Sequence, residues 1–137
     1  MQLQQRIYEG RTECFDIIRR KWVPLTPEEA VRQFLIHFMV EERKIPAVRI
    51  SVEREITVNG LKRRYDLVVY QPGGEILAVI ECKAPHVQLT QAVVEQAGRY
   101  NKTLHAPYIG VSNGKESLFF KIDFESEKIA FLEGWPF

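Results

Sequence analysis

The pattern of apolar and polar positions changes its period several times along the chain, and each stretch of constant period predicts one element. Residues 47–58 alternate between apolar and polar side chains and end at Asn59-Gly60, a strong signal for a two-residue hairpin turn. Residues 61–70 return as a second strand. After the turn at Pro72-Gly73-Gly74, the nearly continuous apolar run over residues 76–83 is typical of a buried central strand.

A helical period begins after Thr26-Pro27-Glu28-Glu29, a sequence typical of a helix start. The threonine suits the N-cap, the proline suits the first helical position, and Glu29 completes a capping box. Apolar residues then recur at helical spacing until Pro46. We therefore expect a helix over about residues 27–43.

The rest of the chain predicts strands around a second helix. Helical spacing returns over residues 87–104, with Thr90 as a possible N-cap. Further strands are expected at residues 107–112, 117–122 and 129–132, and a short one near residues 14–18. This order predicts a mixed α/β (α+β) fold in which helices flank a central mixed sheet. Because no linker divides the sequence, we expect a single domain over residues 1–137.

The composition is typical of a globular domain and excludes few classes of function. Apolar residues make up 45% and charged residues 27%, so disorder is not expected. The apolar runs are shorter than the roughly 18 residues of a membrane span, and the N-terminus lacks the apolar core of a signal peptide. We therefore expect a cytoplasmic protein with no membrane partner. The net charge of +1 counts mildly against a tight DNA binder acting alone.

Three charged residues stand out because their surroundings are mostly apolar. Glu81 and Lys83 end the apolar strand, and side chains two residues apart on a strand point to the same face. Asp66 lies on the preceding antiparallel strand, close enough across the ladder to converge with Glu81. Two carboxylates suit Mg²⁺, which proteins usually hold by one or two carboxylates together with substrate phosphate. Lys83 would then position an attacking water or stabilise the transition state of phosphodiester hydrolysis.

A purely structural interpretation of these residues is also open. Asp66 could be a charge at a strand edge, and Glu81 with Lys83 an ion pair on one solvated strand face. The charges end a strand that the pattern predicts to be buried, where unpaired charge is costly. Their position therefore favours a functional site.

The spacing of these residues resembles a nuclease signature. Asp66, fourteen intervening residues and then Glu81-Cys82-Lys83 are similar to the Asp-x(n)-Glu-x-Lys pattern of PD-(D/E)XK nucleases, with Tyr65 in place of the usual proline. The chain resembles more closely the N-terminal nuclease domain of type I restriction enzyme R subunits. Matching segments occur in the family's order over about residues 25–120, namely residues 27–33, 64–70, 80–85, 96–100 and 112–114.

The resemblance implies a restriction-endonuclease-like α-β-β-β-α-β core with a metal site at the forked end of the central strands. It implies that Asp66 and Glu81 are the metal ligands and Lys83 a catalytic residue, with Mg²⁺ as the cofactor and Mn²⁺ as a possible substitute. Gln96 and Tyr100, one helical turn apart, would meet DNA or orient the lysine. Without the resemblance, a helix-edge amide and a core aromatic would explain these two residues.

The first predicted helix should supply one more acid to the site. Glu28 lies three residues before Val31 and seven before Leu35, so it should share their inward face, whereas Glu29 should point away. We therefore take Glu28 as a further catalytic residue. Alternatively, both acids only complement the helix dipole.

The resemblance covers less than a whole R subunit. Those subunits carry large ATP-driven translocase domains after the nuclease, whereas this chain ends at Phe137 without a Walker motif. We expect a nuclease domain without translocase, free-standing or part of something longer. The leading hypothesis is a Mg²⁺-dependent DNA endonuclease that works as a homodimer or in a larger restriction-type complex. The alternative is a catalytically silent nuclease fold that binds nucleic acid or a protein partner.

Overall fold

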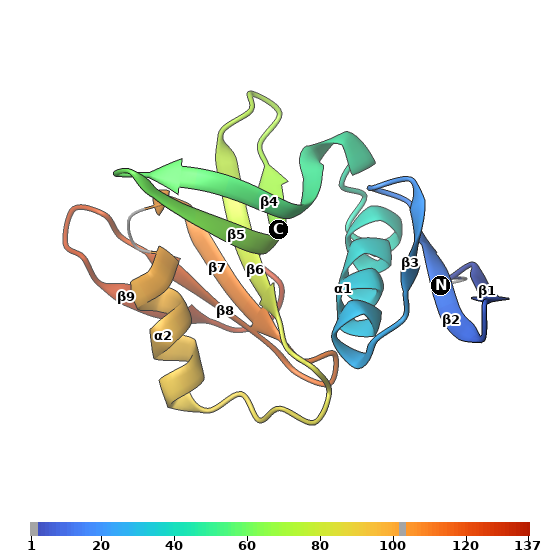
Figure 1. The fold of residues 1–137 in the computed structure, drawn as a ribbon. Coiled ribbons are helices and arrows are strands. Elements are labelled where there is room, and N and C mark those ends of the chain that lie inside the picture. Colours follow the sequence, from blue (N-terminus) through green and yellow to red (C-terminus); the bar gives the residue numbers. More distant parts are fainter. Residues whose placement is uncertain (1–2, 102–103) are drawn as a thin grey trace.

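The chain forms two β-sheets and two α-helices within the residues that the structure describes (Figure 1). The computed structural model describes residues 3–101 and 104–137, and only the backbone of Val58, Arg99, Tyr100 and Asn101. The helices are α1 (Pro27–His37) and α2 (Gln91–Asn101). The strands are β1 (Gln5–Tyr8), β2 (Arg11–Asp16), β3 (Lys21–Pro24), β4 (Ile50–Val58), β5 (Leu61–Tyr70), β6 (Ile76–Cys82), β7 (Tyr108–Ser112), β8 (Ser117–Ile122) and β9 (Ile129–Leu132). None of the described helices is long and apolar enough to cross a membrane.

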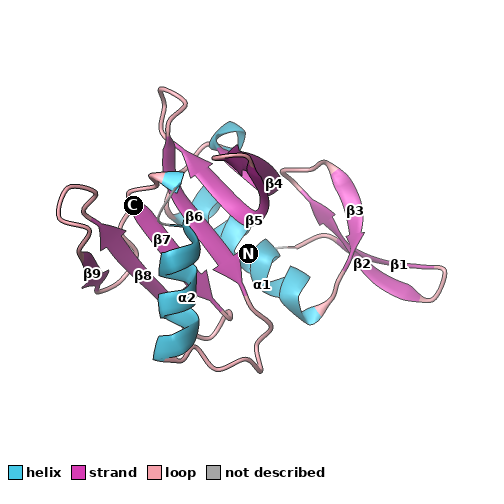
Figure 2. Ribbon diagram, turned by 60° about the vertical axis from the view of Figure 1, so that its left-hand side comes forward, coloured by secondary structure: helices cyan, strands magenta, loops and turns pink. Residues whose placement is uncertain are grey.

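A six-stranded mixed sheet in the order β4-β5-β6-β7-β8-β9 forms the centre of the fold (Figure 2). Neighbouring strands are antiparallel except β6 and β7, which run parallel and are connected through α2. The β4–β5 hairpin turns at Asn59 and Gly60, whose φ angles of 51° and 78° lie in the left-handed region that such a turn requires. The predicted mixed α/β fold is confirmed.

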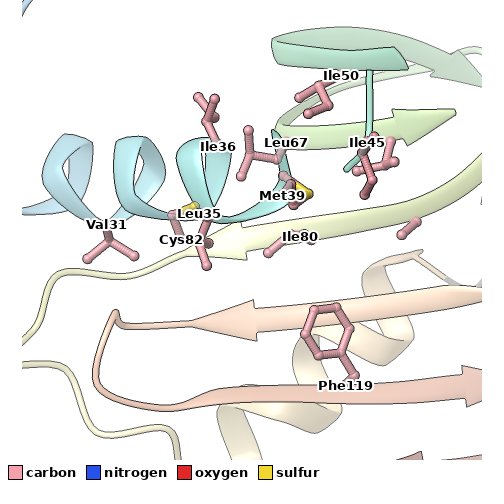
Figure 3. Packing of buried hydrophobic residues seen from close by; sticks show 12 residues of the cluster. Val31, Leu35, Ile36, Met39, Ile45, Ile50, Leu67, Ile80, Cys82 and Phe119 are labelled. Atoms are coloured by element: carbon pink, nitrogen blue, oxygen red, sulfur yellow. The ribbon is translucent and has the colours of Figure 1, made fainter. Parts of the chain in front are cut away.

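The two α-helices cover opposite faces of this sheet, and strand alternation decides which residues meet each helix. β5 and β6 present Leu67 and Ile80 to Leu35 of α1 in one buried cluster (Figure 3). The alternate residue Val68 lies in a second buried cluster with Val94 of α2. Because β6 and residues 67–70 of β5 are covered on both faces, these stretches are nearly continuous apolar runs in the sequence.

Most of the predicted element boundaries shift by only a few residues. Thr26 Oγ1 accepts the backbone N–H of Glu29 at 3.1 Å, which confirms Thr26 as the N-cap of α1. After His37 the chain adds one π-helical turn that ends at Glu42, close to the predicted end of the helix. The α2 helix begins later than the helical spacing predicted, directly after Thr90, whose Oγ1 accepts the backbone N–H of Val93 at 3.3 Å, as expected of an N-cap.

The N-terminal residues form a separate three-stranded antiparallel sheet, β1-β2-β3, where the sequence predicted only a short strand. Its first hairpin turns at Glu9-Gly10, with φ angles of 49° and 77°. Cys14 and Val23 are buried on one face of this sheet. The turn between β2 and β3 brings Ile17 against the α1 side of the core. This turn also positions Asp16 and Arg19 next to α1.

Aromatic residues at the C-terminus close the α1 side of the core. The ring of Trp135 lies 4.9 Å from that of Phe38 and 4.6 Å from that of Phe119. Phe137 also packs against this cluster. The core therefore extends beyond residues 25–120, the range in which the sequence analysis found matching segments.

Candidate functional site

Asp66 lies where strands β5 and β6 separate. The last pair of their register at this end is Leu67 with Ile80, so Asp66 and Glu81 are the next residues along the two strands. The backbone N–H of Cys82 donates to Oδ2 of Asp66 at 2.8 Å. The Asp66 carboxylate therefore bridges the fork between the strands.

Glu81 and Lys83 lie together on the other arm of this fork. Nζ of Lys83 is 3.8 Å from Oε2 of Glu81, and their side chains are 39% and 29% exposed. Burial raises the pKa of Glu81 above its ordinary value; the Lys83 ammonium offsets part of this rise, and the charge of Asp66 adds to it. Asp66 and Glu81 are thus close enough to interact electrostatically.

Gln96 faces the same place from α2. Glu81, Lys83, Val93 and Gln96 line a small cavity of about 220 Å³. The structure therefore brings Gln96 beside two of the residues of the predicted triad. The side chain of Tyr100 lies outside the described residues, so its role stays a prediction.

The two acids at the start of α1 are placed opposite to the expectation. The side chain of Glu28, expected to face inward, is 51% exposed, and it lies 3.8 Å from Arg32. Glu29, expected to point away, is buried and accepts hydrogen bonds from Arg19 at 2.7 Å and from Arg32 at 3.0 Å. The Thr26 N–H donates to the carbonyl two residues earlier, so the capping box is not completed by Glu29. The orientation was wrong because the turn between β2 and β3 supplies Glu29 with a cation, the half-buried Arg19.

Arg32 is a cation of this site that the sequence analysis did not single out. It is 5% exposed, and its Nη2 donates to Oδ1 of Asp66 at 3.2 Å while Nη1 donates to Glu29. Glu53 on β4 lies 3.7 Å from Nη1. A signal was available, because Arg32 follows Glu28 and Glu29 by four and three residues, the spacing of ion pairs on a helix.

Asp16 and Arg19 connect Glu29 and Gln33 of α1 to the N-terminal sheet. Asp16 is fully buried and accepts from Nε of Arg19 at 2.6 Å and from the amide of Gln33 at 2.9 Å. Burial acts to raise the pKa of Asp16, but hydrogen bonds from the backbone and guanidinium of Arg19 outweigh it, so this pKa lies below its ordinary value. Polar contacts therefore run without a break through Asp16, Arg19, Glu29, Arg32 and Asp66.

The fork between β5 and β6 has two carboxylates and no complete set of protein ligands for a metal ion among the described residues. Among the described residues, histidine, cysteine, aspartate and glutamate side chains form no group of three or more that could hold a metal ion. Asp66 and Glu81 still match the one or two carboxylates by which proteins usually hold Mg²⁺ together with substrate phosphate. A cation between them would also relieve the repulsion that contributes to the raised pKa of Glu81. Asp66 and Glu81 are therefore donors of the type that a magnesium ion takes.

Comparisons with known proteins place this mixed α/β domain in a family. Residues 27–136 match the family described as Type I restriction enzyme R protein N terminus (HSDR_N), and the chain belongs to this family. Among solved structures, it is similar to a fragment of a putative HsdR subunit of a type I restriction enzyme from Vibrio vulnificus YJ016. The two are 22% identical with a TM-score of 0.42, and the similarity covers 64% of this chain and 16% of that one. No curated protein matches the chain.

Proposed function

We propose that this chain is a Mg²⁺-dependent DNA endonuclease domain of the PD-(D/E)XK type. The observation that carries the proposal is the Asp66 carboxylate, held at the fork of β5 and β6 next to Glu81 and Lys83. Membership in a family of restriction enzyme R proteins supports DNA as the substrate. Because the chain spans 16% of the similar HsdR fragment, only the domain's own chemistry is proposed.

Each residue of the proposed site has a position that suits its role. Asp66 and Glu81 would hold Mg²⁺, which supplies an activated water and offsets charge on the leaving oxygen. The Lys83 ammonium, part-exposed beside Glu81, would orient the attacking water or a phosphate oxygen. Gln96, on the α2 wall of the cavity, would donate its amide to the nucleic acid.

The proposal includes a DNA partner and an assembly. The net charge of +1 supplies little general attraction to a phosphate backbone. A homodimer or a larger restriction-type complex would therefore provide part of the DNA affinity. Two copies of the site would also allow both strands to be cut.

Cleavage of supercoiled plasmid in Mg²⁺ or Mn²⁺ tests this function. We compare the wild-type chain with Asp66→Asn, in which the amide oxygen can still accept the N–H of Cys82, and with Lys83→Ala. The matched control is Lys121→Ala, an exposed lysine on β8. We expect both site variants to lose at least about 100-fold in rate, the usual cost of removing one group that stabilises a transition state. The control should cut as the wild type does.

Two outcomes would contradict the proposal. Wild-type protein that leaves DNA intact with either metal, free or in a restriction-type complex, would favour the catalytically silent alternative. Cleavage that persists in Asp66→Asn would place the chemistry elsewhere.

A further inference from the structure

The guanidinium of Arg32 donates hydrogen bonds to two carboxylates from fixed directions. Nη1 donates to Oε1 of Glu29 at 3.0 Å, and Nη2 donates to Oδ1 of Asp66 at 3.2 Å. The side chain of Arg32 is only 7% exposed. Because the guanidinium is a rigid plane, the contact with Glu29 on one side constrains where the other side meets Asp66.

Glu29 is itself held in place by several donors. Its Oε1 accepts from Nη2 of Arg19 at 2.7 Å, and its Oε2 accepts from the amide of Gln33 at 3.3 Å. A movement of Arg32 would therefore break buried ion pairs, which is strongly unfavourable. Arg32 has a rigid support on the side away from Asp66.

Asp66 is held from two elements at once. The N–H of Cys82 on β6 bonds to Oδ2, and Arg32 on α1 bonds to Oδ1. With one donor on each oxygen, the plane of the carboxylate is fixed between the helix and the sheet. Carboxylates that bind metal ions usually have such hydrogen-bonding partners behind them.

We propose that Arg32 is the positioning residue of the nuclease site, which holds the Asp66 carboxylate in the orientation that a divalent ion requires. This inference rests on the proposed function. Arg32 acts through geometry rather than through its charge. The two modes of action predict opposite effects on metal binding when Arg32 is replaced. Removing a positive charge next to a metal ligand tightens metal binding if charge alone matters, whereas removing a positioning partner weakens it.

Titration of the whole chain with Mn²⁺, with free Mn²⁺ measured by electron paramagnetic resonance, separates these modes. We expect Arg32→Gln to weaken Mn²⁺ binding by about 10–100-fold, the usual effect of losing a partner behind a metal ligand. Arg32→Lys should weaken it similarly, because an ammonium is a point charge without the guanidinium fork. The control is Glu53→Gln, an acid near Arg32 with a side chain that is 41% exposed. Its affinity should change by less than about threefold, because charges at the surface are screened.

The outcomes distinguish this inference from the function on which it rests. Arg32→Gln that binds Mn²⁺ as tightly as the wild type, or more tightly, overturns the positioning role and leaves the metal site intact. If Arg32→Gln does not fold by near-ultraviolet circular dichroism, Arg32→Lys decides: wild-type affinity in that variant shows that charge alone suffices. Wild-type protein without Mn²⁺ binding, or Asp66→Asn with unchanged affinity, overturns both the inference and the proposed function.

Discussion

Replacing Asp16 by asparagine should destabilise the protein by about 3 kcal/mol. The carboxylate is fully buried and receives hydrogen bonds from Nε of Arg19 at 2.6 Å and from Gln33 at 2.9 Å. Each hydrogen bond to a charged group contributes roughly 1.5 kcal/mol, and the asparagine NH₂ in place of Oδ2 accepts neither, so losing both gives about 3 kcal/mol. Arg19 keeps its ion pair with Glu29 at 2.7 Å. The cost therefore stays below the roughly 5 kcal/mol of a fully stranded buried charge.

Thermal unfolding at neutral pH measures this loss. For a chain of 137 residues we expect the melting temperature to fall by roughly 10 °C. The control is Asp123→Asn. Asp16 accepts the backbone N–H groups of Ile18 and Arg19, and Asp123 likewise accepts the N–H groups two and three residues later, but it is fully exposed, so the change should be small. Because the pKa of Asp16 is lowered in the folded protein, its stabilisation is present above the ordinary value of 3.8 and is lost as the pH falls through the folded pKa. Equal melting temperatures for Asp16→Asn and wild type at neutral pH would refute the buried network.

Three further predictions concern Glu81, the two cysteine thiols and the packing at Gly110. Burial raises the pKa of Glu81, so the ionised side chain costs folding free energy at neutral pH. Glu81→Gln should therefore stabilise the protein at neutral pH in urea unfolding, and this gain should vanish below about pH 4.5, where the carboxyl is protonated in both states. Burial, with nearby carboxylates, raises the pKa of Cys14 to about 11 and also raises that of Cys82, so mass spectrometry should find both thiols unalkylated by iodoacetamide until the protein is unfolded. A Cβ at Gly110 would lie 2.5 Å from the ring of Phe119, so Gly110→Ala should cost about 1–3 kcal/mol in urea unfolding, and an unchanged midpoint would contradict this packing.

Features coded by short-range signals could be predicted from the sequence. The Asn59-Gly60 turn and the Thr26 cap depend on neighbouring residues alone, and both appear as expected. Glu9-Gly10, which forms the first hairpin of the N-terminal sheet, lacks such a signal, because glutamate is not among the residues that favour the first position of this turn. The antiparallel pairing of β5 with β6, which makes Asp66 and Glu81 the next residues after the last pair, also follows from the predicted strands and the turn between them.

Features that depend on contacts between distant segments could not be predicted. Glu28 and Glu29 are adjacent on a helix, and Glu29 is the one that meets Arg19, a residue from outside the helix, in its buried position. The bond between Arg32 and Asp66 joins residues 34 positions apart. Helical spacing indicated that Arg32 could pair with the acids before it, but it carried no information about the strand that Arg32 would meet.

Anomalous diffraction from crystals soaked in MnCl₂ tests the central claim most directly, because it locates the ion without relying on catalysis. We predict a peak within coordination distance of both Asp66 and Glu81 in the wild-type protein and no peak in Asp66→Asn. A peak at another place, or well-ordered carboxylates too far apart to share one ion, would contradict the proposed metal site.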